Sequence, residues 1–389
     1  MPLLPPPIRV LLSESGKGLT KGKKWLSSSD LSGAAVQASS VFLDLERSTA
    51  KACDLIREAG SKGADFIVFP EGFLPGHPTW FHFQPVSSPL SNELNLRLFK
   101  NAVRVPGPEV EAIGQAARDA GSYVVLGVCE RASGAQGSLF NSQLFFGPDG
   151  QYLGKHQKLQ PTAGERIVHW GGWGDTLGPF ETEYGPVSAL VCGENSNPLE
   201  IFALTAAGTR LHGMSWPPHF RSAANGTSLM PQTSLLAAQN FALMSKAFVI
   251  SACGIVHPGY AEDLGISAES AQKIASGAGQ GGSAIIGPDT RVLAGPLDGR
   301  TEGIIYADLD FDQWARQKIA QDFAGHYNRN DVFQLRINRK PPAGYISEDD
   351  PTTTEHFTGA ASAEAGQDSG EHETLLTDVN WSPKIGPAK

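Results

Sequence analysis

Three residues that could do chemistry together each stand just beyond a stretch that is expected to form a strand. Glu71 follows the apolar run "ADFIVF", Lys158 follows a hairpin that ends in "QYLGK", and Cys192 follows "PVSALV". The carboxyl ends of strands border the crevice in which α/β folds place their chemistry. A carboxylate, an ammonium and a thiol there could supply a base, an electrostatic stabiliser and a nucleophile, so these three residues are our candidate catalytic group.

Cys192 has two interpretations. Free cysteines are commonly buried and inert, and we interpret Cys53, in an expected helix, and Cys253, in an expected strand, in that way. Cys192 differs because it ends a strand in "VCGENSNP" and a helix is expected to begin at Pro198. A thiol becomes a nucleophile when a base and a cation lower the cost of forming the thiolate. Spacing alone leaves both interpretations open.

Glu71 and Lys158 also have a structural and a functional interpretation. Glu71 either faces solvent at the start of a loop or is partly desolvated by the aromatic side chains of "GFLPGHPTWFHF". Desolvation would raise its pKa, which suits a general base. Lys158, in "GKHQKLQPTAGER", is either a surface lysine or a cation that stabilises a tetrahedral anion. Glu165, in the same segment, could hold such a lysine in place.

Apolar patterns and turn signals predict strands alternating with helices, together with two hairpins that share a Gly-Pro-Asp turn. The alternation favours sheets covered by helices, an α/β sandwich, and the repeated hairpin suggests two related halves. Strands are expected at 33–39, 64–69, 122–128, 187–192, 210–215, 248–253 and 303–309, helices at 44–62, 92–103, 108–120, 198–207 and 233–245, and hairpins at 139–155 and 281–297.

Composition separates a folded body from two expected extensions. The chain has 389 residues, of which 40% are hydrophobic, and a formal net charge of −9. Residues 1–32 are rich in proline and lysine, with apolar stretches too short for a membrane span or a secretory signal. Residues 341–389 hold nine acidic residues against two lysines and few apolar ones, so we expect a flexible acidic tail. The catalytic domain is expected at 33–340, and no basic stripe in it points to nucleic acid.

The cysteines indicate a reduced compartment. Cys53, Cys129, Cys192 and Cys253 are widely spaced and form no CxxC pair. This pattern favours a reduced, cytoplasmic protein over a disulfide framework or a zinc cluster. The ten histidines show no HExxH spacing, so the sequence gives no signal for a metal site.

Taken together, the motifs resemble those of the nitrilase superfamily of carbon-nitrogen hydrolases, and within it the true nitrilases. "VFPEGFLPGHPTW", "KHQKLQPTAGERIVHWGGWGD" and "VCGENSNPLEIFAL" are similar to the family's three catalytic blocks and stand in the same order. "AAVQASSVFLDLERSTAKA" and "GHYNRNDVF" extend the resemblance over about residues 33–338. "TAGERIVHWGGWGD" departs from the family, which commonly has a shorter version with fewer tryptophans.

The resemblance implies a catalytic triad of Glu71, Lys158 and Cys192, with Glu165 as the second glutamate that positions the lysine and the substrate. It implies a four-layer αββα sandwich, extended to αββααββα across a homodimer that can grow into spirals or filaments. It implies no metal and no organic cofactor. The partners expected are a small nitrile and further copies of the chain, and neither nucleic acid nor a membrane.

The residues after the cysteine favour nitriles as substrates. "CGENSNP" resembles the nitrilase version of this block, whereas fungal cyanide hydratases usually have tryptophan where this chain has Gly193. The expected reaction converts a nitrile to a carboxylic acid and ammonia through a thioimidate and a thioester on Cys192. The Gly193 N–H is expected to help stabilise the tetrahedral intermediate. Action on amides, release of amide from nitriles, cyanide hydrolysis and a catalytically silent assembly module remain alternatives.

Aromatic residues in or beside the catalytic blocks bear on the choice of nitrile. They either line the substrate pocket or pack in the core or at a dimer interface, and they are Trp80, Phe81, Trp170, Trp173 and Trp216. If they line the pocket, an aromatic or arylaliphatic nitrile is favoured over a short aliphatic one.

Overall fold

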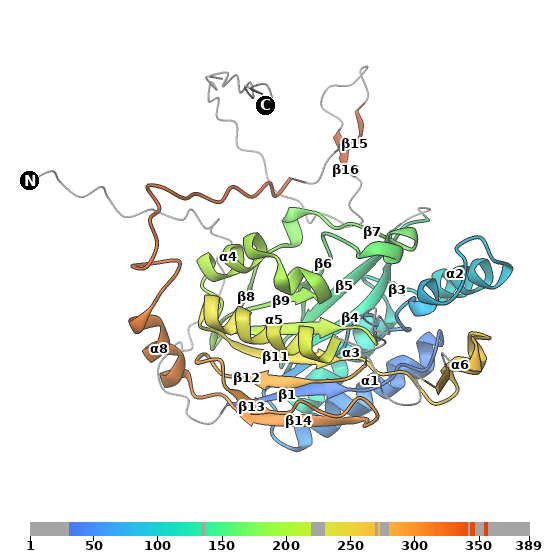
Figure 1. The fold of residues 1–389 in the computed structure, drawn as a ribbon, viewed down its shortest axis with the longest axis horizontal. Coiled ribbons are helices and arrows are strands. Elements are labelled where there is room, and N and C mark those ends of the chain that lie inside the picture. The colour runs from blue at the N-terminus through green and yellow to red at the C-terminus, as the bar shows by residue number, and fades with distance from the viewer. Residues whose placement is uncertain are drawn as a thin grey trace, which may run out of the picture. The chain divides into compact units, whose positions relative to one another are not determined.

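The computed structural model describes residues 31–133, 137–218, 230–268, 271–272, 280–340, 343–346 and 354–356 (Figure 1). Most of the expected extensions, residues 1–30 and the greater part of 341–389, lies outside these residues. Within the tail, two short strands, β15 (Ala343–Ile346) and β16 (Thr354–His356), pair antiparallel. No helix in the described part of the chain is both long and apolar enough for a membrane span.

The first sheet carries two of the candidate catalytic segments. Its strands run in the order β14-β1-β2-β4-β5-β6, with β3 paired to β4 and β7 paired to β5. Strands β1, β2 and β4 are parallel, whereas β4, β5 and β6 form an antiparallel meander. The strands are β1 (Ser32–Gln37), β2 (Phe66–Val68), β3 (Val103–Arg104), β4 (Tyr123–Arg131), β5 (Leu139–Phe146), β6 (Tyr152–Gln157), β7 (His169–Trp170) and β14 (Gly303–Asp308).

The second sheet carries the candidate nucleophile. Its order is β13-β12-β11-β10-β9-β8, and the three central strands β9, β10 and β11 are parallel. The strands are β8 (Phe180–Thr182), β9 (Gly185–Val191), β10 (Leu211–Trp216), β11 (Phe248–Cys253), β12 (Ala284–Ile286) and β13 (Val292–Ala294).

Helices cover the outer face of each sheet. Helices α1 (Leu45–Ser61) and α3 (Pro108–Ala120) bury residues such as Ile56 and Ile113 against the first sheet. Helices α4 (Pro198–Ala206) and α5 (Met230–Ser245) lie together over the second sheet (Figure 1). The remaining helices are α2 (Pro89–Asn101), α6 (Tyr260–Asp263) and α8 (Phe311–Ala320).

A third apolar cluster joins the inner faces of the two sheets. It includes Phe66 and Val125 from the first sheet and Ala189, Phe248 and Ile250 from the second. The order is therefore helices, sheet, sheet, helices, and the predicted four-layer αββα sandwich is confirmed. The layering across a dimer stays a prediction. Because the two sheets face each other, loops at their carboxyl ends can meet at one edge of the sandwich.

Local signals placed most boundaries within a few residues. Helix α3 begins at the predicted Pro108 and stops at Gly121, whose φ of +66° is a left-handed cap that glycine adopts without strain. Helix α2 begins at Pro89, before the predicted 92, because the Ser88 side chain accepts a hydrogen bond from Ser91 N and proline occupies the first turn. Both hairpins are confirmed, one in each sheet, while the short strands β7 and β8 were not predicted.

Candidate active site

Cys192 lies at the turn between β9 and a short 3₁₀ helix, η4 (Cys192–Ser196). Its φ is +54°, a left-handed conformation that is uncommon for residues other than glycine and that clusters at functional sites. The Asn195 side chain holds this turn by donating to the Leu190 and Cys192 carbonyls at 3.1 and 3.0 Å, and Asn195 Oδ1 lies 2.9 Å from His212 Nε2. The thiol is therefore fixed at the carboxyl end of a parallel strand.

Glu71 is held between the two sheets. Its backbone N–H donates to the Trp216 carbonyl, at the end of β10, at 3.3 Å. On its other side, the backbone of Glu71 passes close to β4 at Gly127. A Cβ atom on Gly127 would lie 2.2 Å from Pro70 O and 2.9 Å from Glu71 Cα. Glycine at position 127 is what allows this close approach of the Glu71 backbone. Glu71 is 2% exposed, so its carboxylate is directed into the protein.

Lys158 lies just beyond β6 and joins the two glutamates. Its Nζ is 2.8 Å from Glu71 Oε1 and 2.6 Å from Glu165 Oε2, and all three side chains are almost fully buried. Glu165 stands in the 3₁₀ helix η2 (Ala163–Ile167), where Oε2 also accepts from Thr162 N at 2.9 Å as part of a capping box. One buried ammonium thus ties together two carboxylates from separate loops.

Asn141 of β5 is a member of this group that the sequence analysis missed. Its Nδ2 donates to Glu71 Oε1 at 2.6 Å and to Glu165 Oε1 at 2.7 Å, and its backbone carbonyl accepts from Lys158 N at 2.8 Å. Strand β5 is buried along its whole length. The signal that could have found Asn141 is the polar triplet "NSQ" inside the otherwise apolar "LFNSQLFF", because buried polar side chains need partners.

Two histidines flank the carboxylates and were also missed. His169 Nδ1 lies 3.1 Å from Glu165 Oε1. His77 Nε2 lies 3.4 Å from Glu71 Oε1, close enough for attraction but without hydrogen-bond geometry. Donor atoms of Glu71, His77 and Glu165 lie within 4.8 Å of one another, a spacing that could suit a metal ion. Lys158 Nζ, bonded to both carboxylates, already supplies the positive charge there.

Burial and the neighbouring charges together set the pKa values of the two glutamates and the lysine. Burial by itself would raise the pKa of Glu71, but Lys158 and His77 outweigh it and the pKa is lowered. Likewise, Lys158 outweighs burial and holds the pKa of Glu165 well below its usual range. Burial would lower the pKa of Lys158, but the two carboxylates hold it well above its usual range. The prediction of a raised Glu71 pKa is wrong because it counted desolvation and omitted the ion pair.

For the Cys192 thiol, burial outweighs the attraction of Lys158. Burial and the negative charge of Glu71 hold the pKa of its thiol well above the usual range, although Lys158 acts against them. The resting site therefore holds a protonated thiol beside a carboxylate at neutral pH. Within the described residues, Glu71 Oε2 is buried without a hydrogen-bond partner, while Oε1 is occupied by Lys158 and Asn141. Glu71 Oε2 is the oxygen left to receive a proton.

A cavity of about 290 Å³ opens onto these groups. Gly193, predicted to contact the substrate, is not among the lining residues, but it lies near one of them, since a Cβ atom on Gly193 would lie 3.9 Å from the Thr162 hydroxyl oxygen. The four sequence-predicted catalytic residues therefore meet at one cavity. The lining residues are Glu71, His77, Phe81, His82, Lys158, Thr162, Ala163, Gly164, Glu165, Cys192 and Pro217.

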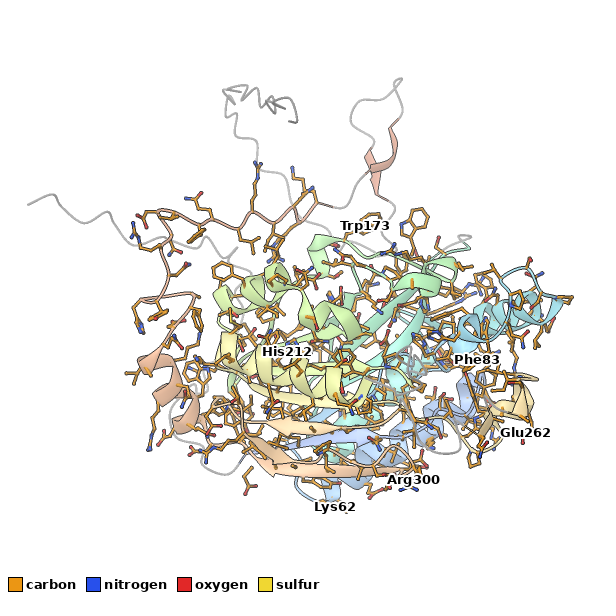
Figure 2. The ribbon with its side chains drawn as sticks, viewed as in Figure 1. Lys62, Phe83, Trp173, His212, Glu262 and Arg300 are labelled. Atoms are coloured by element: carbon orange, nitrogen blue, oxygen red, sulfur yellow. The ribbon has the colours of Figure 1, made fainter. Side chains whose placement is uncertain are left out.

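The three tryptophans predicted to bind substrate are not among the lining residues. Trp80 is 1% exposed and packs with Phe42, and its indole N–H donates to Asn95 Oδ1. Trp216 is buried beneath α5 and contributes its backbone carbonyl to Glu71. Trp173 lines a separate hollow of about 570 Å³ (Figure 2). For Trp80 and Trp216, core packing is thus the interpretation that the structure favours, because both rings are needed to fill the interior.

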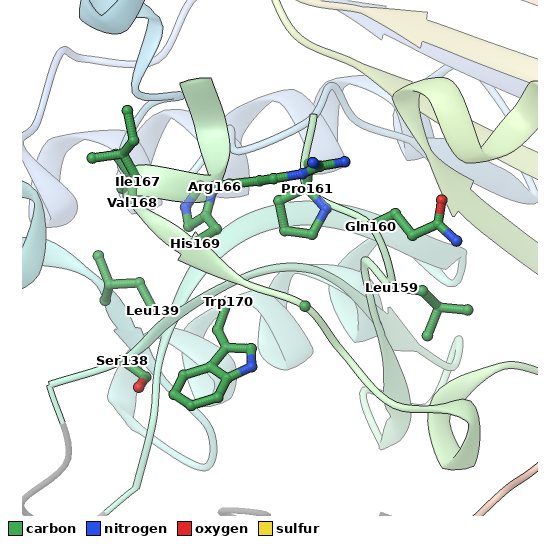
Figure 3. Close-up of a pocket in the computed structure, with 11 residues that line it drawn as sticks. Ser138, Leu139, Leu159, Gln160, Pro161, Arg166, Ile167, Val168, His169 and Trp170 are labelled. Atoms are coloured by element: carbon green, nitrogen blue, oxygen red, sulfur yellow. The ribbon is translucent and has the colours of Figure 1, made fainter. Parts of the chain in front are cut away.

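Trp170, from the tryptophan-rich departure in the sequence, also lies away from the catalytic cavity. It is 51% exposed and borders a hollow of about 560 Å³ between Leu139, Pro161 and Arg166 (Figure 3). Of the five aromatic residues considered for substrate binding, Phe81 lines the catalytic cavity.

Comparison with known proteins agrees with this fold and identifies the family. The carbon-nitrogen hydrolase model matches residues 34–319, and the chain belongs to that family. Within the family it lies in the nitrilase branch. Nitrilase 2 of Arabidopsis thaliana is 37% identical over 335 residues, which cover 83% of this chain and 93% of that protein.

Two further relatives differ from each other in the substrates that their names state. An arylacetonitrilase of Aspergillus niger is 35% identical over 307 residues, 78% of this chain and 90% of that protein. An aliphatic nitrilase of Rhodococcus rhodochrous is 34% identical over 309 residues, 79% of this chain and 82% of that protein. Such similar identities do not distinguish between the two kinds of nitrile.

Solved structures share the fold at low sequence identity. The NitFhit protein of C. elegans matches with a TM-score of 0.60 and 17% identity, over 83% of this chain and 71% of that one. A carbon-nitrogen hydrolase from Helicobacter pylori G27 matches with a TM-score of 0.60 and 16% identity, over 77% and 96%. At these low identities, the similarity shows a shared αββα fold and nothing further.

Proposed function

We propose that this member of the nitrilase branch hydrolyses an organic nitrile to a carboxylic acid and ammonia, with Cys192 as nucleophile. The observation that carries the proposal is the meeting of a thiol, an ionised carboxylate and a buried ammonium at one cavity of about 290 Å³. The names of the relatives, which include arylacetonitrilase and aliphatic nitrilase, support nitriles as the substrate class.

The first half of the reaction uses Glu71 and Cys192. Glu71 Oε2 takes the thiol proton as the sulfur attacks the nitrile carbon and then passes it to the former nitrile nitrogen, which gives a thioimidate and leaves Glu71 ionised. A water then adds to the thioimidate carbon with Glu71 as base. The tetrahedral intermediate breaks its C–N bond, ammonia leaves, and a thioester remains. A second water attacks the thioester and releases the acid and the free thiol, so the reaction consumes two waters.

One cation and one backbone N–H support these steps. Lys158, fixed by Glu71 and Glu165, presents a positive charge to the thiolate and to the tetrahedral intermediate. The Gly193 N–H, next to the sulfur, is the proposed second donor. Such fixed donors are commonly worth about 10²–10³ in rate, since they require no reorganisation during the reaction.

We favour a compact arylaliphatic or aromatic nitrile as substrate. The cavity is near the lower end of the size that ligand sites usually have. Phe81 and His82 line it with aromatic side chains, and Gly193, next to the nucleophile, adds no side chain of its own. Phe81 is thus the member of the five aromatic residues named in the sequence analysis that supports this preference.

A panel of nitriles, with ammonia, acid and amide measured separately, tests the proposed function. Wild-type protein should release ammonia and acid, and Cys192→Ala should fold but show no turnover. Cys253→Ala is the matched control, because Cys253 is also buried and free but lies in the core of the second sheet. Normal hydrolysis by Cys192→Ala would reject the mechanism, and turnover of amides without nitriles would reject the substrate class.

Two finer expectations join the proposal. A homo-oligomer built on a dimer is supported by apolar side chains that stay exposed on α4 and α5, namely Leu199, Leu236 and Leu243. A cytoplasmic location is supported by four cysteines that are all free and buried. Sedimentation of the full chain would test the first, since a monomer at micromolar concentration would contradict it.

A further inference from the structure

Glu194 is a buried carboxylate that lies behind the nucleophile and outside the cavity lining. It is 4% exposed and stands in η4, two residues after Cys192. Val191, the residue that precedes the nucleophile, donates its backbone N–H to Glu194 Oε2 at 3.0 Å. Leu159, the residue that follows Lys158, donates its backbone N–H to Glu194 Oε1 at 2.6 Å.

These two hydrogen bonds join the two sheets at the catalytic edge. Val191 ends β9 of the second sheet, whereas Leu159 follows β6 of the first. The same carboxylate therefore holds the immediate chain neighbours of Cys192 and of Lys158. Because the Glu194 carboxylate bonds to two backbone N–H groups, it fixes the spacing between the sulfur and the ammonium more firmly than side-chain packing alone can.

His156 completes the link from the far side. Its Nε2 lies 3.0 Å from Glu194 Oε2 and its Nδ1 lies 3.3 Å from the Thr176 carbonyl. Both neighbours are acceptors, so the ring satisfies both when each nitrogen carries a proton. Burial would lower the pKa of His156, but attraction to Glu194 raises it overall. The imidazolium and the carboxylate thus form a buried ion pair.

Other titratable groups face this pair from α4 and β10. Glu200, in the first turn of α4, has its pKa raised to about 8 by burial and by the charge of Glu194, so it is largely neutral at pH 7. His212 on β10 has its pKa held well below its usual value by burial and by His156. The negative charge nearest to His156 is therefore that of Glu194.

We propose that Glu194 is a positioning residue that sets the distance between Cys192 and Lys158 by bonding to the backbone on both sides of the site. The inference rests on the catalytic roles proposed for those two residues. A displacement of about 1 Å in such a site can cost about 10²-fold in rate. Because Glu194 does not line the cavity, substrate binding should change little when it is altered.

The test is Glu194→Gln assayed in the full-length protein with a nitrile that the wild type hydrolyses. Glutamine has the same size, but its NH2 group must face a backbone N–H or the His156 ring, and one bond is lost. We expect kcat to fall about 30- to 100-fold with KM within about twofold of wild type. The pH dependence of Cys192 alkylation by iodoacetamide should also shift, because the ammonium no longer lies at its set distance from the sulfur.

Glu130→Gln is the matched control. Glu130 of β4 is likewise buried, and its carboxylate accepts from Ser142 Oγ, Lys155 Nζ and Gln157 Nε2, outside the cavity lining. It should lower the melting temperature without lowering kcat by more than about threefold or moving the alkylation profile. A general loss of stability would affect both variants alike.

The outcomes separate the inference from the proposed function. If Glu194→Gln keeps wild-type kcat and the wild-type alkylation profile, or behaves like Glu130→Gln, the positioning role is overturned. If Cys192→Ala is active, the proposed function itself fails. Should Glu194→Gln give no folded protein, His156→Gln replaces it: kcat lowered at least fivefold with KM unchanged supports the link, and wild-type kcat overturns it.

Discussion

Replacing Lys158 with methionine removes the cation that two buried carboxylates share. Glu71 and Glu165 lie 2.8 and 2.6 Å from the ammonium and are almost fully buried. Methionine has a similar length but no charge, so the two buried carboxylates would lie close together without the cation that neutralises them. Removal of one partner from a buried ion pair typically costs about 3–5 kcal/mol of stability.

The loss of stability in Lys158→Met can also be estimated from the change in carboxyl pKa. Two carboxylates that share a buried site cannot both ionise freely, so the pKa of one of them should rise by about 3 units in the variant. Each unit corresponds to about 1.4 kcal/mol, which gives about 4 kcal/mol. The two estimates agree, and in a chain of this size the melting temperature should drop by roughly 5–10 °C.

The sign of the pH dependence follows from the direction of each shift. In the wild type the pKa values of Glu71 and Glu165 are lowered, so their contribution to stability is present above the unfolded pKa of about 4.3 and is lost as the pH falls through the folded values. In Lys158→Met one carboxyl pKa is raised, so stability is lost as the pH rises toward that value. The variant should be most destabilised near pH 8 and least near pH 5.

Thermal unfolding of both proteins at pH 5 and pH 8, with ammonia release assayed in parallel, checks this reasoning. Lys155→Met is the control, because Lys155 of β6 pairs with Glu130 of β4, and its loss leaves a single carboxylate that keeps two other donors. It should remain active and show a smaller pH effect. A stability difference between wild type and Lys158→Met that is the same at both pH values would refute the shared-cation model.

Three further variants test the remaining parts of the site. Glu165→Gln should lower turnover at least 10²-fold while the protein stays folded, because Lys158 loses half of its anchoring charge; near wild-type rates would leave Glu165 a structural role alone. Asn141→Ala should reduce the free energy of unfolding by about 2–4 kcal/mol in urea titrations, since two charged acceptors lose a donor, and an unchanged midpoint would contradict this. Phe81→Ala should lower kcat/KM for arylaliphatic nitriles about tenfold relative to short aliphatic ones, and an equal loss on both would exclude Phe81 from substrate choice.

Sequence patterns predicted the parts of the site that stand at strand ends. Glu71, Lys158 and Cys192 each follow a recognisable strand, and parallel strands place their carboxyl ends at one edge, so their meeting could be expected. Asn141 could not be assigned in the same way, because it lies inside β5 and reaches both carboxylates only through its pairing in the meander. Glu194 was visible in "CGEN", but its partner Leu159 follows a strand of the other sheet, β6.

The sequence by itself determined the alternation of strands and helices, the two hairpins and the residues available for catalysis, because these follow from local patterns of apolar residues and turns. Tertiary structure decided what depends on distance through space. It lowered the pKa of Glu71, which desolvation alone would have raised, because Lys158 lies 2.8 Å away. It also placed Trp80 and Trp216 in the core and Phe81 at the cavity, since packing between layers, and not proximity in the chain, selects the residues that line the cavity.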